Sequence, residues 1–161
     1  MKNWIPLIVA VIAATTAFIG YLVNSAVGRR LERARYYADA LTAVEKYRQL
    51  PFTFKRRHDS TKETRAELAS MLGDVQVTLA FYRRWLELDS PAVGTAYNRL
   101  IDKIRDKNSE FRKLALSSPI AENDADIEID RNNPYKFEDR AELNECVALM
   151  RRELRFLKWP R

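Results

Sequence analysis

Residues 4–28 read WIPLIVAVIAATTAFIGYLVNSAVG, and the interpretation of the whole chain depends on this stretch. No charged side chain occurs in residues 3–28. As a helix, that run would rise roughly 39 Å, which exceeds the roughly 30 Å hydrocarbon core of a bilayer. Trp4 and Tyr21 lie toward its two ends, where amphipathic rings prefer the lipid headgroup layer. The stretch therefore predicts a single helix that crosses a membrane.

A cleaved signal peptide and a buried helix of a water-soluble protein are the alternatives to a membrane anchor. A secretory signal has an apolar run of roughly 7–15 residues before a small-residue cleavage site. The triplet Val23-Asn24-Ser25 would pass as such a site. The apolar run here is longer, however, and arginines follow it at once, as in a stop-transfer sequence. We therefore expect a retained signal-anchor over residues 1–28, with both alternatives still open.

Four arginines follow the predicted span and form what we call the basic collar: Arg29, Arg30, Arg33 and Arg35. Only Glu32 offsets them, and Lys2 is the one charged side chain before the span. Cytoplasmic flanks of spans carry an excess of Lys and Arg, so the asymmetry predicts the N-terminus outside and the bulk of the chain in the cytoplasm. The collar would also contact anionic lipid, each cation contributing about 1 kcal/mol near the surface.

The formal net charge of +6 is unevenly distributed along the 161 residues. Residues 29–57 hold nine basic and three acidic side chains, whereas residues 119–139 hold two basic and seven acidic ones. The basic excess therefore lies next to the span, where membrane topology explains it, and nucleic-acid binding is not expected.

The single cysteine, Cys146, excludes an internal disulfide framework and a multi-cysteine metal site.

Apolar residues recur at helical spacing in four segments after the span. We predict helices over residues 29–50, 61–88, 91–116 and 137–158. Pro51 is expected to end the first helix, and the span can run directly into that helix because no proline interrupts residues 7–50. The sequence STKE at residues 60–63 is typical of a capping box before the second helix, and Ser90-Pro91 marks the start of the third.

These four helices are expected to pack on one another. The turn at residues 88–91 is short, so the second and third helices should be antiparallel neighbours. The predicted fold class is all-α, with a single N-terminal transmembrane helix followed by an antiparallel helical bundle of about four helices. Residues 1–28 would form the anchor and residues 29–161 a cytoplasmic helical domain. An intermolecular coiled coil is the competing use of the same apolar stripes.

Two charged connections are the candidate partner surface, because an up-and-down path places residues 51–59 and 117–136 at the same end of the bundle. The first carries Lys55, Arg56 and Arg57, and the second, a long acidic loop, carries Asp124, Asp126, Glu128 and Asp130. A connection of about twenty residues is long for a compact bundle, and such loops are usually functional or disordered. We expect these side chains to contact a protein partner.

No metal site, cofactor or catalytic residue is predicted. The acids of residues 122–130 have a spacing that could hold Ca²⁺ or Mg²⁺, but Ile129 stands where an EF-hand needs glycine and Tyr135 where it needs the bidentate Glu. His58 is the only histidine and lies in a predicted loop, while Cys146 lies beside the apolar stripe of the last helix. No phosphate-loop, Gly-x-Ser-x-Gly or His-Glu-x-x-His motif occurs, so we do not expect an enzyme.

Small or short polar side chains recur every four residues along the predicted span, at Thr16, Gly20, Asn24 and Gly28. This spacing permits close helix approach in lipid, so the face could support a homo-oligomer.

The leading hypothesis is a single-pass, membrane-anchored and non-catalytic interaction or adaptor protein that presents its bundle and charged loops to a protein partner. The alternative is a membrane-active effector whose span oligomerises and perturbs the bilayer.

Overall fold

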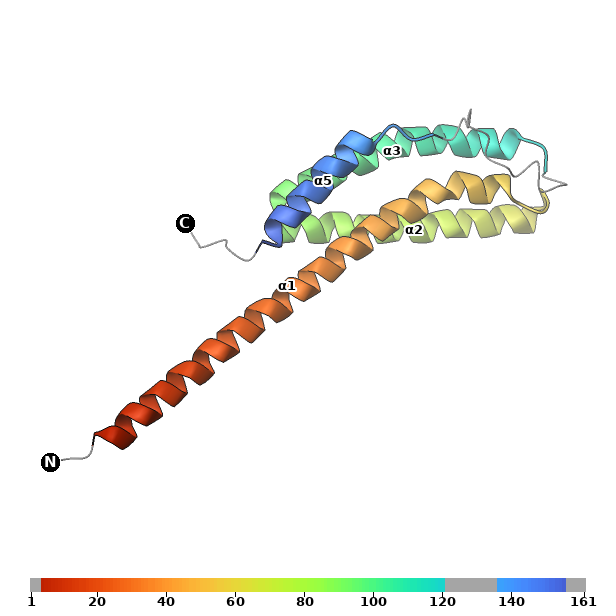
Figure 1. Cartoon of the computed structure of the whole chain (residues 1–161). Coiled ribbons are helices and arrows are strands. Elements are labelled where there is room, and N and C mark those ends of the chain that lie inside the picture. The colour runs from red at the N-terminus through yellow and green to blue at the C-terminus, as the bar shows by residue number, and fades with distance from the viewer. Residues whose placement is uncertain (1–3, 121–135, 156–161) are drawn as a thin grey trace. The chain divides into compact units, whose positions relative to one another are not determined.

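A computed structural model describes residues 4–120 and 136–155. Within these ranges the chain forms four helices and no strands: α1 (Ile5–Lys55), α2 (Lys62–Asp89), α3 (Pro91–Ser117) and α5 (Arg140–Glu153) (Figure 1). The prediction of an all-α chain, with one long apolar N-terminal helix followed by packed helices, is confirmed. The chain divides into two compact units, Met1–Tyr37 and Ala38–Arg161, and α1 contributes to both.

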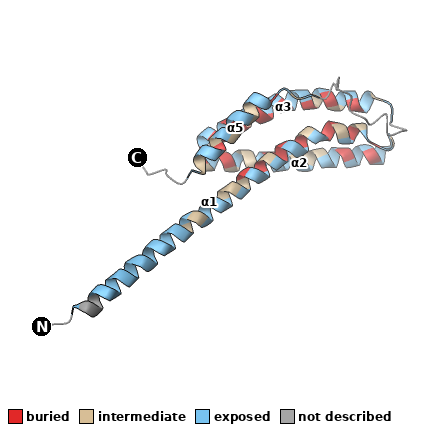
Figure 2. Cartoon of the chain, viewed as in Figure 1, coloured by how far each residue is buried: buried red, intermediate tan, exposed pale blue. Residues whose placement is uncertain are grey.

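The Met1–Tyr37 unit is dominated by the apolar half of α1. From Ile8 to Asn24 every side chain is exposed, which appears as an unbroken pale-blue ribbon in Figure 2. The hydroxyls of Thr15 and Thr16 donate to the carbonyls of Val11 and Ile12 at 2.8 and 2.9 Å, so their polar groups are satisfied within the helix. Among the described residues, α1 is the one helix long and apolar enough to cross a membrane.

The prediction that Pro51 ends the first helix is wrong, because α1 continues to Lys55. Proline has no N–H to donate to the carbonyl four residues earlier, which belongs to Tyr47. The side-chain amide of Asn108, on α3, donates to that carbonyl instead. Pro51 and Asn108 are both fully buried. A donor from a neighbouring helix thus replaces the missing backbone hydrogen bond, and the connection to α2 shortens to residues 56–61.

The α2–α3 hairpin closely follows its predicted bounds of 61–88 and 91–116. Ser90 is the N-cap residue of α3 and Pro91 occupies its first turn, as expected. The cap of α2 is displaced by one residue from the predicted capping box: Thr61, not Ser60, accepts from the backbone N–H of Thr64 at 3.3 Å. The carboxylate of Asp59 supports this cap by accepting from the N–H and the hydroxyl of Thr61.

The two helices of the hairpin approach each other closely near its turn. A Cβ added to Gly94 would lie 2.7 Å from the Cα of Glu87, so only glycine allows this backbone approach. Asn98 extends the contact, since its amide donates to Glu87 at 2.7 Å and its carbonyl oxygen accepts from Arg83 at 2.9 Å. These pairs establish the antiparallel register of α2 and α3.

The helix α3 is the centre of the Ala38–Arg161 unit, since it packs against both α2 and α5. The buried Tyr97 hydroxyl donates to the Ala40 carbonyl at 3.0 Å, and this contact together with that of Asn108 shows that α1 and α3 run parallel. The core around α3 includes the buried apolar side chains Val44, Leu50, Leu79, Leu86, Val93, Leu100, Ile104, Phe111, Cys146 and Met150.

The last helix is shorter than the predicted 137–158. It begins at Arg140 and ends at Glu153, and residues 156–158 lie outside the described part of the chain. Side-chain contacts hold the preceding residues in a non-helical path. Phe137 packs edge-on against Phe111 with 5.1 Å between ring centroids, and the Arg48 guanidinium lies over the Phe137 ring. Arg48 also approaches the buried carboxylate of Asp139 at 3.5 Å.

Candidate functional site

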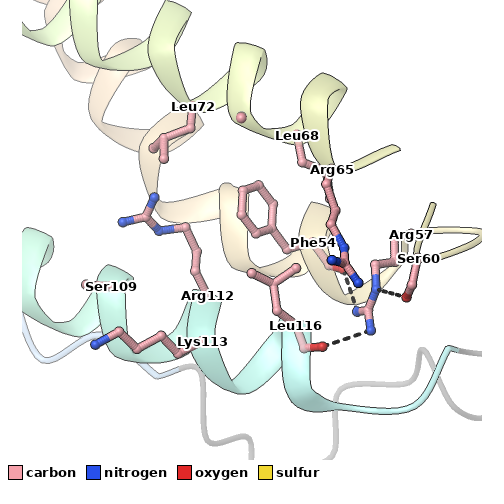
Figure 3. A pocket seen from close by; sticks show the side chains of 11 residues that line it. Phe54, Arg57, Ser60, Arg65, Leu68, Leu72, Ser109, Arg112, Lys113 and Leu116 are labelled. Carbon is pink, nitrogen blue, oxygen red and sulfur yellow. Dashed lines mark hydrogen bonds between the residues drawn. The ribbon is translucent and has the colours of Figure 1, made fainter. Parts of the chain in front are cut away.

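A cavity of about 520 Å³ opens between α2 and α3 within the Ala38–Arg161 unit (Figure 3). Four residues of each helix line it: Arg65, Leu68, Ala69 and Leu72 on α2, and Ser109, Arg112, Lys113 and Leu116 on α3. Each set has the spacing i, i+3, i+4, i+7, which is one face of a helix about 10 Å long. Phe54 from α1, with Arg57 and Ser60 from the following connection, completes the lining. We call this cavity the basic groove.

The floor of the basic groove is apolar. Phe54 and Leu68 are 5% and 6% exposed, whereas Leu116 is 45% exposed at the edge. Figure 3 shows the Phe54 ring between the leucines of α2 and Leu116 of α3. An open apolar floor of this kind favours a ligand that contributes an apolar side chain or chain segment.

The rim of the basic groove carries one sign of charge. Four of the eleven lining residues are basic, namely Arg57, Arg65, Arg112 and Lys113, and none is acidic. Arg65 and Lys113 are exposed and make no ion pair with any residue that the structure describes. A concave surface lined by unpaired cations attracts anionic groups.

Arg57 is occupied by the fold itself. It is 7% exposed, and its guanidinium donates to the carbonyls of Ala115, Leu116 and Ser118 at 2.7, 3.0 and 2.8 Å. Two further bonds reach the Phe54 carbonyl and the Ser60 hydroxyl. These bonds satisfy the last carbonyls of α3, which have no partner within the helix. Arg57 therefore joins the α1–α2 connection to the end of α3 and closes one end of the basic groove.

The other predicted partner residues have different positions. Lys55 is the last residue of α1 rather than a loop residue, and Arg56 is exposed in the connection that follows. Neither lines the basic groove. Asp124, Asp126, Glu128 and Asp130 of the predicted acidic loop lie outside the described residues, so their contact with a protein partner stays a prediction.

The collar and the small-residue face both lie on α1. Arg29, Arg30 and Arg35 are exposed, and Arg33 donates to the Tyr37 hydroxyl at 3.5 Å. On the face formed by Thr16, Gly20, Asn24 and Gly28, a Cβ added to either glycine would meet nothing within 4 Å. This face is open along the helix, and its self-association stays a prediction.

A second, smaller cavity of about 180 Å³ continues the same helix faces. Its α2 lining is Gln76, Leu79, Ala80 and Arg83, which extends the stripe of Arg65 to Leu72 without a break in phase. Ile101 and Arg105 line it on α3, and Tyr47 lies on α1. Here the cations are paired, because Asp102 accepts from Arg83 at 2.6 Å and from Arg105 at 2.8 Å.

Neither Cys146 nor His58, the two side chains considered in the sequence for their chemistry, lines the basic groove. Burial raises the pKa of the Cys146 thiol to about 11, so it stays protonated at neutral pH inside the core. His58 is exposed beside Asp59 at 3.2 Å. No group of three or more His, Cys, Asp or Glu side chains among residues 4–120 and 136–155 could hold a metal ion.

The residues that make the basic groove were not predicted as a set. Arg65, Arg112 and Lys113 each flank an apolar helix stripe, which is a signal present in the sequence, but their convergence depends on the register of α2 against α3.

In comparisons with known proteins, no family model matches the chain, and no match was found among curated proteins or solved structures.

Proposed function

We propose that this chain is a single-pass, membrane-anchored interaction protein without catalytic activity, whose helical unit docks a partner protein. The observation that carries the proposal is the combination of two features in one chain. One is an apolar helix with its side chains exposed, and the other is a compact helical unit with an open groove whose rim carries the unpaired cations Arg65 and Lys113. The first feature suits lipid and the second suits an anionic surface.

The exposure of the α1 side chains supports membrane insertion. Ile12 and Phe18 are 60% and 61% exposed, and nearly all their neighbours are apolar. Apolar area in water costs about 25 cal/mol per Å², so a helix with this surface is unfavourable in water and favourable in hydrocarbon. The exposed collar at Arg29, Arg30 and Arg35 supports an orientation with the helical unit in the cytoplasm.

The basic groove supports docking as the role of the helical unit. Arg65 and Lys113 have no carboxylate partner in the described structure, and the apolar floor between them is open. A tethered protein with such a site acts by recruitment, because anchoring confines the bound partner to the membrane surface. The basic collar would orient the unit on anionic lipid.

The anchoring is tested by alkaline carbonate extraction of membranes that contain the full chain. We expect the protein to stay in the membrane pellet, and we expect the variant Ile12→Lys/Phe18→Lys to be released. Lys103→Glu, an exposed charge change on α3, is the matched control and should stay in the pellet. Release of the unmodified chain, or a mature protein that lacks the first two dozen residues, would overturn the proposal.

The orientation has its own test. A cytoplasm-dependent reporter fused after Arg161 should be active, and an export-dependent reporter at the same position should be silent.

Expression of residues 1–35 alone distinguishes the membrane-active effector from the interaction protein. Growth arrest or dye leakage from vesicles would favour the effector, and silence would favour the interaction protein.

A further inference from the structure

We propose that the basic groove and the smaller cavity beside it bind one acidic amphipathic helix of a partner protein. Apolar side chains of that helix would enter the two cavities, and its carboxylates would pair with Arg65 and Lys113. This inference rests on the docking role proposed above and names the chemistry of the docked partner.

The continuity of the helix faces points to an elongated ligand. The α2 residues that line the two cavities begin at Arg65 and end at Arg83, all on one stripe. That stripe is about 27 Å long. A compact small molecule would occupy one cavity, whereas an elongated segment can use both.

The spacing of the cavities matches a helix. Phe54 and Tyr47, which line one cavity each, are seven residues apart on α1, or about 10 Å. The corresponding α2 linings are eleven residues apart, or about 16 Å. A docked helix repeats the same face at i, i+7 and i+11, so its apolar side chains would meet both cavities.

The distribution of charge fixes where the acidic groups of the ligand lie. Arg83 and Arg105 at the smaller cavity are already paired with Asp102. Arg65 and Lys113 at the basic groove are unpaired among the described residues. The carboxylates of the partner helix would therefore lie over the basic groove, and the end over the smaller cavity would be more apolar.

The test uses the full chain in nanodiscs of zwitterionic phosphatidylcholine. The probe is a fluorescein-labelled helical peptide of about eighteen residues, with leucine at positions i, i+7 and i+11 and glutamates beside the first leucine. Fluorescence anisotropy should show saturable binding of this peptide. A peptide with lysine in place of each glutamate should not bind, and equal binding of both peptides would overturn the assignment.

Two pairs of matched variants locate the site. Arg65→Glu/Lys113→Glu should weaken binding about tenfold, because two attractions become repulsions, whereas Lys103→Glu on another face of α3 should leave it unchanged. Ala69→Trp should block the groove without a change in charge, and Ala66→Trp, an exposed alanine of α2 outside the lining, should not. Binding that both Arg65→Glu/Lys113→Glu and Ala69→Trp leave intact would refute the site.

Competition with sodium oleate tests whether the groove binds an anionic lipid instead of a partner helix. We expect oleate not to displace the peptide, and displacement that Ala69→Trp abolishes would assign the groove to an anionic lipid instead. Failure of the peptide to bind, in a chain that still resists carbonate extraction, would refute the helix ligand and leave the anchoring intact.

Discussion

Asn108 on α3 supplies the hydrogen bond that Pro51 removes from α1, by donating to the carbonyl of Tyr47. Asn108 and Pro51 are both fully buried. The donor Asn108 and the acceptor Tyr47 are 61 positions apart in the sequence. A proline inside a helix normally leaves a carbonyl without a donor and bends or ends the helix. Here the neighbouring helix repairs the defect, and the last turn of α1 delivers Phe54 to the basic groove.

Asn108→Leu should therefore destabilise the helical unit by about 1–3 kcal/mol, because the Tyr47 carbonyl is left buried without its donor. Pro51→Ala restores a backbone N–H at that position, so the cost of Asn108→Leu should be smaller in the Pro51→Ala background. The four unfolding free energies of this double-mutant cycle, from urea titrations in detergent micelles, measure the coupling. Additive effects would show that the two residues act independently.

Arg57→Met should be among the most destabilising single changes outside the apolar core, with a loss of about 3 kcal/mol or more. The substitution leaves three carbonyls at the end of α3 without donors and removes a buried charge from its partners. Arg56→Met, at the exposed neighbour, should change the unfolding free energy by about 0.5 kcal/mol or less. Equal effects of the two variants in thermal melts would contradict the assigned role of Arg57.

Two glycines in helices should respond oppositely to alanine. Gly94→Ala places a Cβ 2.7 Å from the Glu87 Cα and should destabilise the α2–α3 pair in spite of the better helix propensity of alanine. Gly73→Ala meets nothing within 4 Å and should stabilise α2 by about 0.5–1 kcal/mol. Circular dichroism melts of the two variants, side by side, decide the matter, and a stabilising Gly94→Ala would exclude close backbone contact there.

The cap of α2 should weaken in acid. A hydrogen bond from the Thr64 side chain, followed by one from the Thr61 backbone, lowers the pKa of Asp59 from 3.8 to about 2. Because the folded-state pKa is the lower one, the contribution is complete above about pH 4 and is lost as the pH falls through about 2. Between pH 5 and pH 2, the melting temperature of the native chain should fall more than that of Asp59→Asn. Parallel pH profiles would argue against this role of Asp59.

The extent to which the sequence predicted the fold differs among the elements. The bounds of α2 and α3 follow from local signals, since Ser90 and Pro91 mark a helix start and the apolar stripes have helical period. The continuation of α1 beyond Pro51 could not be predicted locally, because its donor lies on another helix. Similarly, the lead-in to α5 depends on Arg48 and Phe111, far from Phe137 in sequence.

The candidate site shows the same division. Arg56 and Arg57 are adjacent and chemically alike in the sequence, yet one is exposed and the other is held by five hydrogen bonds. Only the position of the α3 C-terminus separates them. Arg65 and Lys113 are ordinary surface cations in their own helices, and the α2–α3 register brings them to one rim.

The spacing of α2 and α3 changes along the hairpin. The two backbones approach closely at Gly94, whereas at the basic groove the Phe54 ring lies between the leucines of α2 and Leu116 of α3 (Figure 3). The size of the side chain at position 54 therefore contributes to the width of the groove between α2 and α3. A substitution at this one position would therefore change the width of the groove that a ligand can enter, without replacing any of the cations on its rim.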